Sequence, residues 1–267
     1  MKTTTALAFF ILISFYSFSQ RTKPNKMSLV PKGTFVVKED TTSRKISIDA
    51  FWMSEEITNK EYREFIMSLK NNPKDSIGII DYKKLKDVKN KNAALKTHSY
   101  QEILQNVIDT SVWNSDKNFK NYFNDKKFDN YPVVGVTFMN AVFYCYWRTK
   151  TENELRNDKG LPFTMNYRLP QEIEWEYAAT NSIAPLETEI YKVIKKVNSG
   201  NKSDFDLHNH NDNVSEWTAS TAENGDKIIK GSSWKTYRKL SDRVSAKPSF
   251  RDNSTGFRIV KSYVGKK

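Results

Sequence analysis

Residues Tyr167 to Ala179 read YRLPQEIEWEYAA, a short extended segment that a proline separates from a helix. The residues after Pro170 predict a helix that begins at Glu172, and its acidic first turn suits the positive end of a helix dipole. Carboxylates at alternate positions suggest acid–base chemistry, but Glu172 and Glu174 face different sides of a helix. We therefore expect these carboxylates to cap the helix and to pair with Arg168.

The segment at 27–57 has the pattern of short strands. Ile46 to Trp52 alternates apolar and polar side chains, as a half-buried strand does. Thr58 and Glu61 follow with the spacing of a capping box, in which a hydroxyl and a carboxylate satisfy each other's backbone donors. The sequence therefore predicts a helix over 59–70.

A buried strand and a second helix are predicted in the middle of the chain. Pro132 to Val136 is an apolar run, and Thr137 is placed to cap the helix that follows. Cys145 lies on the apolar stripe of that helix. A catalytic thiol would need a basic partner, and no histidine is near in sequence, so we interpret Cys145 as a buried hydrophobic residue.

Two regions have the composition of loops. Residues 71–130 carry few large apolar side chains, and we interpret them as a solvated basic insertion rather than a patch for anionic partners. Its lysines include Lys83, Lys84, Lys86, Lys89, Lys91 and Lys96. Residues 209–260 are rich in Asn, Asp, Ser, Gly and Trp, which indicates irregular loops with short strands at 228–230 and 257–260.

Composition restricts the class of protein. The chain has 267 residues, of which 38% are hydrophobic and 13% aromatic, enough for a folded core. A single cysteine excludes an intramolecular disulfide and a cysteine-based zinc cluster. The net charge is +12, yet the sequence contains no aromatic RNA-binding motif, so we expect no nucleic-acid partner.

The first residues read as an export signal over 1–19. A basic start is followed by an apolar run from Ala6 to Phe15, and Ser17 and Ser19 suit a cleavage site before Gln20. The run is too short for a membrane span, and no later stretch is apolar enough for one. We expect an exported protein at the periplasm or the outer-membrane periphery, with one domain over 20–267.

Six segments together resemble the signatures of one known family. They are Phe51 to Asn59, Pro132 to Val136, Tyr167 to Ala179, Asn213 to Thr218, Gly231 to Trp234 and Gly256 to Arg258. In this order, and over about residues 28–260, they are similar to the hallmarks of the formylglycine-generating-enzyme (sulfatase-modifying factor) superfamily. The resemblance implies an α+β domain of C-type-lectin-like topology with much irregular structure.

The resemblance also implies that the family's copper chemistry is absent. The enzymes oxidise a substrate cysteine with a copper ion held by two cysteines, and the matching positions here are Thr236 and Ser241. Hydroxyls do not replace thiolates on soft Cu(I). The iron-dependent members need a histidine triad on an additional helical domain. Only His98, His208 and His210 are present, and we interpret the last two as solvated.

A calcium site is the metal centre that the resemblance leaves open. In the family, a loop before the "EW" motif binds Ca²⁺, and its ligands fall here on the side chains of Asn209 and Glu216 and the backbone carbonyls of Asp212 and Val214. Oxygen ligands suit this hard cation, which would have a structural role. The alternative is an Asn/Asp-rich turn in which Glu216 pairs with a nearby arginine.

Three segments resemble a particular non-catalytic branch, the gliding-motility lipoproteins J and K of the Bacteroidota type IX secretion system. They are Asp109 to Trp113, Cys145 to Thr149 and Ser233 to Lys235. The chain lacks the lipidation cysteine and is shorter than the usual K component. The resemblance implies a periplasmic scaffold in an envelope secretion or gliding machine, alone or as a homo- or hetero-oligomer with a ring partner.

Two alternative functions stay open at this point. One is a divergent metal-dependent oxidoreductase that uses another metal in the same groove. The other is a glycan- or peptide-binding module, in which an exposed Trp113 or Trp234 could stack on a sugar.

Overall fold

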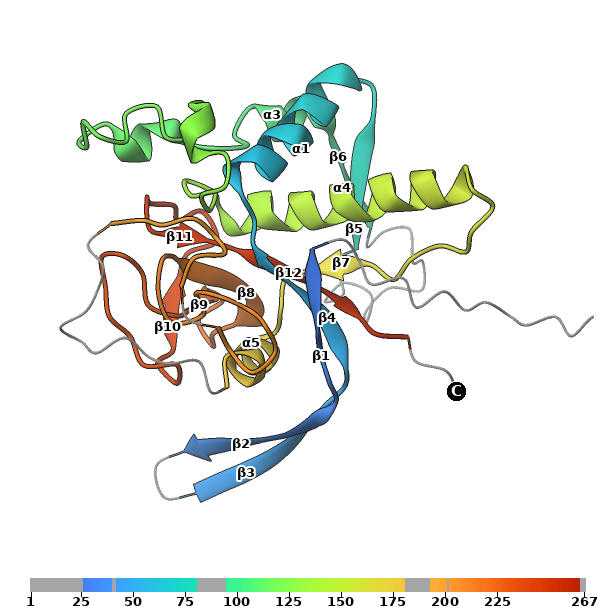
Figure 1. Cartoon of the computed structure of the whole chain (residues 1–267). Helices are drawn as coiled ribbons and strands as arrows, with labels where there is room; N and C mark the ends of the chain where they lie inside the picture. The colour runs from blue at the N-terminus through green and yellow to red at the C-terminus, as the bar shows by residue number, and fades with distance from the viewer. Residues whose placement is uncertain (1–25, 40–41, 81–94, 181–192, 201, 265–267) are drawn as a thin grey trace, which may run out of the picture.

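A computed structural model describes residues 26–39, 42–80, 95–180, 193–200 and 202–264. Helices and strands are mixed along the chain, with long irregular connections between them (Figure 1). This is the α+β class that the sequence predicts. In these ranges, no helix is both long and apolar enough to cross a lipid bilayer. The predicted export signal over 1–19 lies outside the described residues.

Two four-stranded sheets form the framework. The first has the order β1-β4-β12-β7 and is antiparallel throughout. The second has the order β10-β9-β8-β11, in which β11 runs parallel to β8. The strands of the first sheet are β1 (Met27–Val30), β4 (Phe51–Glu56), β7 (Tyr167–Arg168) and β12 (Arg258–Ser262). Those of the second are β8 (Ser215–Thr221), β9 (Lys227–Lys230), β10 (Val244–Ala246) and β11 (Thr255–Gly256).

Two hairpins stand apart from these sheets. Strands β2 (Gly33–Glu39) and β3 (Thr42–Ile48) extend away from the body of the molecule (Figure 1). Strands β5 (Ser76–Ile80) and β6 (Leu95–Ser99) pair beside helix α1. The single strand predicted over 46–52 is two strands, because the chain turns at Asp49 and Ala50 between β3 and β4.

Helices α1 (Asn59–Asn71) and α4 (Phe138–Asn157) begin where the sequence predicts. Thr58 and Thr137 each form a capping box, with Glu61 and Asn140 respectively. Helix α5 (Glu172–Ala178) is also confirmed. The remaining helical turns are α3 (Tyr100–Leu104), η2 (Thr110–Trp113) and η3 (Lys126–Phe128).

The main hydrophobic core lies between α1, α4 and the end of the chain. Tyr62 on α1 stacks on Tyr144 on α4, with ring centroids 5.8 Å apart, and Phe257 meets both rings edge-on. Trp217 on β8 joins this core, and its indole N–H donates to the carbonyl of Val136 at 3.1 Å. The motifs that resemble one family in sequence are therefore in contact with one another.

Residues 95–130 are more ordered than a solvated insertion. Trp113, Tyr122 and Phe128 are buried and form a second aromatic cluster with Val134 and Val214. The prediction underestimated this region because its aromatic residues are spaced irregularly and lie on short turns. Lys96 is exposed on β6, whereas Lys83, Lys84, Lys86, Lys89 and Lys91 lie outside the described residues.

The predicted strand over Pro132 to Val136 is wrong. These residues are buried, but they form only one isolated bridge, between Pro132 and Thr58. Gly135 has φ +76°, and a Cβ there would lie 2.3 Å from the carbonyl oxygen of Asp109. The positive φ and the close backbone contact require glycine and interrupt an extended strand.

Candidate functional site

A buried cluster of charged side chains joins the two sheets. Arg258 on β12 and Glu216 on β8 are both fully buried, and the guanidinium donates to both carboxylate oxygens of Glu216, at 2.6 and 2.7 Å. The indole N–H of Trp175 donates to the same carboxylate at 2.7 Å. A buried charge is tolerated only when it is paired and hydrogen-bonded, and this bidentate pair meets that condition.

Two further carboxylates lie beside this pair. Glu55 lies 3.9 Å from the Arg258 guanidinium, and Glu56 is 1% exposed. Burial, followed by the negative charge of Glu216, raises the pKa of Glu56 well above its usual value. For Arg258, burial alone would lower the pKa, but the carboxylates of Glu216, Glu55 and Glu56 outweigh it and raise the pKa. The arginine therefore stays charged.

The loop from His208 to Asn213 closes over this cluster. Asn209 donates to Glu56 at 2.9 Å and to the carbonyl of Val197 at 2.9 Å, and Asn213 donates to Glu56 at 3.0 Å. Both asparagines have positive φ, 60° and 68°, a conformation that Asn tolerates better than most residues. Among the residues placed by the structure, nothing hydrogen-bonds to the buried Oδ1 of Asn209.

The predicted calcium ligands are brought together only in part. Asn209 and Glu216 are both buried in this cluster, and Val214 packs in the aromatic cluster with Trp113. The Asp212 carboxylate is bonded to Lys195 at 2.5 Å, which leaves its backbone carbonyl as the predicted ligand. Glu216 pairs with an arginine, as the alternative interpretation predicts.

The oxygen atoms at the predicted calcium site still fit a calcium ion in two respects. Oδ1 of Asn209 lacks a hydrogen-bond donor in the described structure, and Oε1 of Glu216 accepts one of the three hydrogen bonds named above, which leaves it a second lone pair. The positive charge of Arg258 opposes a cation at this place. In the described ranges, no group of three or more His, Cys, Asp or Glu side chains could hold a metal ion by itself.

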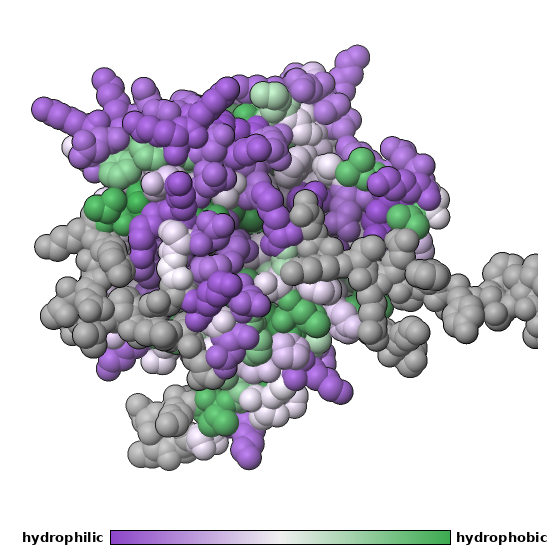
Figure 2. Space-filling model, viewed as in Figure 1, coloured by the Kyte–Doolittle hydropathy of each residue, from purple (hydrophilic) through white to green (hydrophobic). Residues whose placement is uncertain are grey.

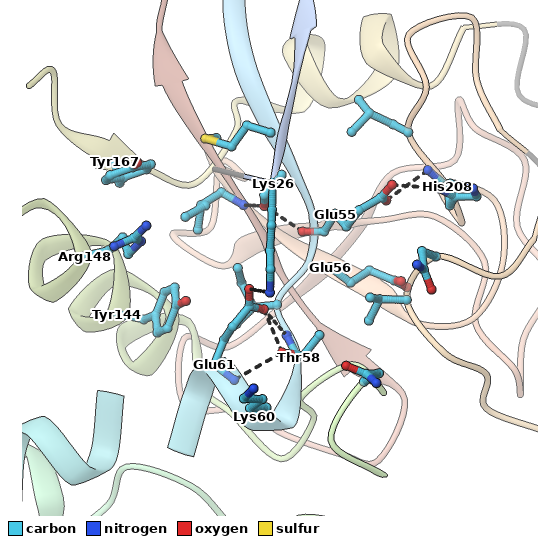
Figure 3. A pocket seen from close by; sticks show the side chains of 18 of the residues that line it. Lys26, Glu55, Glu56, Thr58, Lys60, Glu61, Tyr144, Arg148, Tyr167 and His208 are labelled. Carbon is cyan, nitrogen blue, oxygen red and sulfur yellow. Dashed lines mark hydrogen bonds and ion pairs between the residues drawn. The ribbon is translucent and has the colours of Figure 1, made fainter. Parts of the chain in front are cut away.

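A cavity of about 870 Å³ opens beside this cluster. Figure 3 shows Glu55, Glu56 and Glu61 on one side of it, with Tyr144 and Arg148 on the other. Every one of these acidic groups is already engaged. Glu55 meets the His208 ring at 2.7 Å, Glu61 forms an ion pair with Lys26 at 3.1 Å, and Glu56 accepts from the loop asparagines.

Comparisons with known proteins assign this fold and these motifs to a family. Residues 15–198 and 185–263 match the sulfatase-modifying factor enzyme 1-like domain. The chain belongs to this family. It is 24% identical over 263 residues to the inactive C-alpha-formylglycine-generating enzyme 2 of Bos taurus, which covers 83% of this chain and 78% of the relative. It is 26% identical over 178 residues to the formylglycine-generating enzyme of Bos taurus, which covers 60% of this chain and 41% of that enzyme.

Solved structures agree on the family fold. CarF has a TM-score of 0.57 at 17% identity, over 91% of this chain and 100% of CarF. PvdO from Pseudomonas aeruginosa has a TM-score of 0.56 at 16% identity, over 89% of this chain and 94% of PvdO. At this identity the likeness establishes the fold alone.

Thr236 and Ser241, which the sequence predicts to stand at the copper-ligand positions, lie on a tightly bonded loop. The backbone N–H of Ser233 donates to the carbonyl of Thr236 at 2.8 Å. Arg238 then turns inward, and its guanidinium donates to Ser215 Oγ at 2.6 Å and to the Gly231 carbonyl at 3.3 Å. Ser241 lies further along, on an exposed part of the loop.

The histidines of this family member are not solvated, contrary to the prediction. His208 pairs with Glu55, and its backbone N–H donates to the same carboxylate at 3.0 Å. His210 is 1% exposed and packs edge-on against Trp175, and burial lowers its pKa well below the usual value. The prediction failed because the polar composition of the loop gave no sign that a tertiary contact covers it.

The carboxylates of α5 act as the sequence predicts. Glu174 pairs with Arg168 through two contacts of 2.6 Å, and Glu172 accepts from Arg243 at 2.8 Å. Glu176 pairs with the buried Lys230 at 2.6 Å. Glu172 also lies 3.7 Å from Lys230, so all three carboxylates form ion pairs with basic side chains.

Sequence reasoning missed Arg258, Glu56 and Arg238 as site residues. The first two lie inside motifs that the sequence analysis identified. The available signal was a charged residue next to a buried apolar one in the sequence, because Glu56 precedes Ile57 and Arg258 follows Phe257. Arg238 had no signal, because only the folded loop turns it toward Ser215.

Cys145 should be unreactive in the native protein. It is 2% exposed, and burial raises the pKa of its thiol well above the usual range, so the thiolate that reacts is scarce. We expect labelling by a thiol reagent at neutral pH to be at least about a hundredfold slower in the folded protein than in urea. Labelling at the rate of the unfolded chain would contradict the burial of Cys145.

Proposed function

We propose that this chain is a non-catalytic member of its family that acts as a scaffold in a cell-envelope assembly linked to protein secretion or gliding. The observation that carries the proposal is the loop from Ser232 to Ser241. Where the enzymes present two thiolates, this loop has Thr236 and Ser241. The guanidinium of Arg238, from the same loop, contacts Ser215 on β8.

The chemistry of these groups argues against copper-dependent turnover. Cu(I) is a soft ion that prefers thiolates, and hydroxyl oxygens are hard ligands. Arg238 adds a positive charge beside Ser215 and Gly231, which disfavours a second cation there. The only cysteine, Cys145, is buried on α4 and lies in a different part of the core.

The name of one relative supports the same conclusion. The inactive C-alpha-formylglycine-generating enzyme 2 of Bos taurus matches most of both chains. A retained fold without the redox ligands is the expected result when a family member keeps its surface for binding and loses its reaction.

The envelope role rests on the sequence. The predicted export signal over 1–19 favours a periplasmic location, and the segments that resemble the gliding-motility lipoproteins, such as Asp109 to Trp113, favour a partner in that machinery. In the folded chain Trp113 is 2% exposed and stacks on Trp234 at 5.8 Å. Trp113 is therefore a core residue and does not offer its face to a sugar.

Purified protein should not oxidise a cysteine substrate when it is supplied with copper and oxygen. The assay follows conversion of a cysteine-containing peptide by mass spectrometry, with a catalytic family member as the positive control. Stoichiometric copper binding with peptide oxidation would contradict the non-catalytic proposal.

The envelope proposal is tested separately by cross-linking in native envelopes and mass spectrometry. Recovery of the chain alone in the soluble fraction would contradict it.

Calcium should stabilise the fold through Asn209. A ligand that binds only the folded state adds about 2.7 kcal/mol at a concentration one hundred times its dissociation constant, so the unfolding temperature should rise when Ca²⁺ is added to chelator-treated protein. Magnesium should have a smaller effect because it requires a stricter octahedral geometry. Replacement of Asn209 by Leu should remove the calcium shift, whereas Asn118→Leu at an exposed position should retain it. An equal shift in both variants would contradict a site at Asn209.

A further inference from the structure

An arginine without an acidic partner lines the cavity of about 870 Å³ that opens beside the Arg258 cluster. Arg148 on α4 is only partly exposed, and its guanidinium forms neither an ion pair nor a hydrogen bond with any residue that the structure describes. The face of the molecule in Figure 2 is largely hydrophilic, and water solvates unpaired charges on such a surface. In a recess, by contrast, a charged group is normally paired, so Arg148 is unusual.

The ring of Tyr167 holds this guanidinium in place. The central carbon of the Arg148 guanidinium lies 5.5 Å from the centre of the Tyr167 ring. Tyr167 is itself held by its hydroxyl, which donates to Glu152. A guanidinium over an aromatic face keeps the N–H groups in its plane available, and these match the two oxygens of a carboxylate. Arg148 is therefore preorganised to bind an oxyanion.

The hydroxyl of Tyr144 is a second donor on the same wall. Tyr144 lies one turn before Arg148 on α4, and Figure 3 shows both side chains on one side of the cavity. Its ring stacks on Tyr62, and its hydroxyl reaches the cavity without a hydrogen-bond partner in the described structure. Burial, followed by the negative charge of Glu61, raises the pKa of Tyr144 well above its usual value, although the charge of Arg148 opposes this rise. The hydroxyl therefore keeps its proton and can donate.

The acidic side chains that line the cavity do not occupy Arg148. Three of them have partners within the protein, namely Glu55, Glu56 and Glu61. The fourth, Glu64, is exposed and lies one turn after Lys60 on α1, where opposite charges offset each other. Lys196 is exposed on the loop that lines the cavity and adds another positive charge. The charges that remain are those of Arg148 and Lys196, and both favour an anion.

We propose that this cavity binds a small organic acid, whose carboxylate is held by Arg148 and Tyr144. The guanidinium donates two parallel N–H bonds to the carboxylate oxygens, and the Tyr144 hydroxyl donates to one of them. The apolar part of the acid lies against Met27 and Ile259, which line the same cavity. Cavities of about 300–1,000 Å³ that combine apolar walls with a few polar groups are typical of small-ligand sites. This site goes beyond the scaffold function and does not depend on it.

The test uses 3-phenylpropionate, which combines a carboxylate with an apolar ring. Binding to the purified protein is followed by NMR chemical-shift titration. We expect saturable shifts at Arg148 and Tyr144, and at least about tenfold weaker binding of 3-phenylpropanamide, in which a neutral amide replaces the carboxylate. Acetate should bind more weakly than 3-phenylpropionate because it lacks the apolar ring. No saturable shift with 3-phenylpropionate, or tighter binding of inorganic phosphate, would overturn the proposal.

Substitutions at Arg148 test whether its charge holds the carboxylate. Arg148→Met keeps most of the apolar stem and removes the charge, so we expect about tenfold weaker binding of 3-phenylpropionate and no change for 3-phenylpropanamide. Arg148→Lys retains a charge without the planar fork and should bind with intermediate affinity. Because Arg148 has no ion pair to lose in the described structure, the unfolding temperature of both variants should stay close to that of the wild type.

A second arginine on the same helix provides the matched control. Arg156 lies about two turns after Arg148. It does not line the cavity, and its Nε donates to the carbonyl of Pro162. Arg156→Met changes the net charge by the same amount and should leave the affinity for 3-phenylpropionate within about twofold of the wild type. Equal weakening by Arg148→Met and Arg156→Met would reveal a general effect of charge and would overturn the site at Arg148.

The hydroxyl of Tyr144 is tested by a variant of its own. Tyr144→Phe keeps the ring that stacks on Tyr62 and removes only the donor, so 3-phenylpropionate should bind several-fold more weakly. Unchanged affinity in Tyr144→Phe would overturn the part of the proposal that assigns this hydroxyl to the carboxylate.

Discussion

Replacing Arg258 by Met should destabilise the protein by about 3–5 kcal/mol, a large part of the stability of an ordinary domain. The substitution leaves the Glu216 carboxylate fully buried without its guanidinium partner, and it leaves Glu56 beside that uncompensated charge. The free energy of unfolding is measured by urea denaturation, followed by tryptophan fluorescence. A change below about 1 kcal/mol would show that Glu216 does not depend on Arg258.

Two further variants identify the cause of this loss. Arg258→Met combined with Glu216→Gln removes the unpaired charge while keeping an acceptor for Trp175, and should recover more than half of the lost stability. Arg243→Ala breaks an arginine–glutamate pair whose arginine side chain is 50% exposed, and should cost no more than about 1 kcal/mol. The comparison separates burial of the charge from the loss of an arginine as such.

Replacing Trp113 by Ala should cost about 3–5 kcal/mol, although Trp113 lies in the segment whose composition resembles a loop. The ring is 2% exposed and packs against Tyr122 at 4.6 Å and Trp234 at 5.8 Å. Its removal opens a cavity between this segment and the loop that follows β9. Equilibrium unfolding in urea measures the loss.

A nearby lysine provides the control for this prediction. Lys120 is exposed in the same segment, and Lys120→Ala should change stability by less than about 0.5 kcal/mol. If Trp113→Ala had as small an effect as Lys120→Ala, residues 95–130 would be a solvated insertion and not part of the core. The aromatic cluster would then contribute little to the fold.

Local patterns predicted the helices that begin at a capping residue. The capping interactions of Thr58 and Thr137 each lie within one helical turn. Both partners of each hydrogen bond are therefore close together in the sequence, where they can be recognised. The same patterns failed at Pro132 to Val136. An apolar run shows that a segment is buried, but the carbonyl of Asp109 and the positive φ of Gly135 determine its conformation.

The candidate site depended more on tertiary contacts. The sequence alone identified the family motifs, and it predicts that Thr236 and Ser241 stand where the family's enzymes have copper-binding cysteines, because residue identity is enough to show that a thiolate is missing.

Only the folded chain brings Arg258 to Glu216, Glu56 to the loop asparagines and Arg238 to Ser215. Arg258 and Glu56 lie more than two hundred residues apart in the chain, yet β12 and β4 pair side by side. The sequence therefore determined the family motifs and the lack of any cysteine at residues 231–241, since both follow from residue types. The tertiary structure decided which charges are paired and which are left unpaired, since burial and distance arise only when distant segments pack.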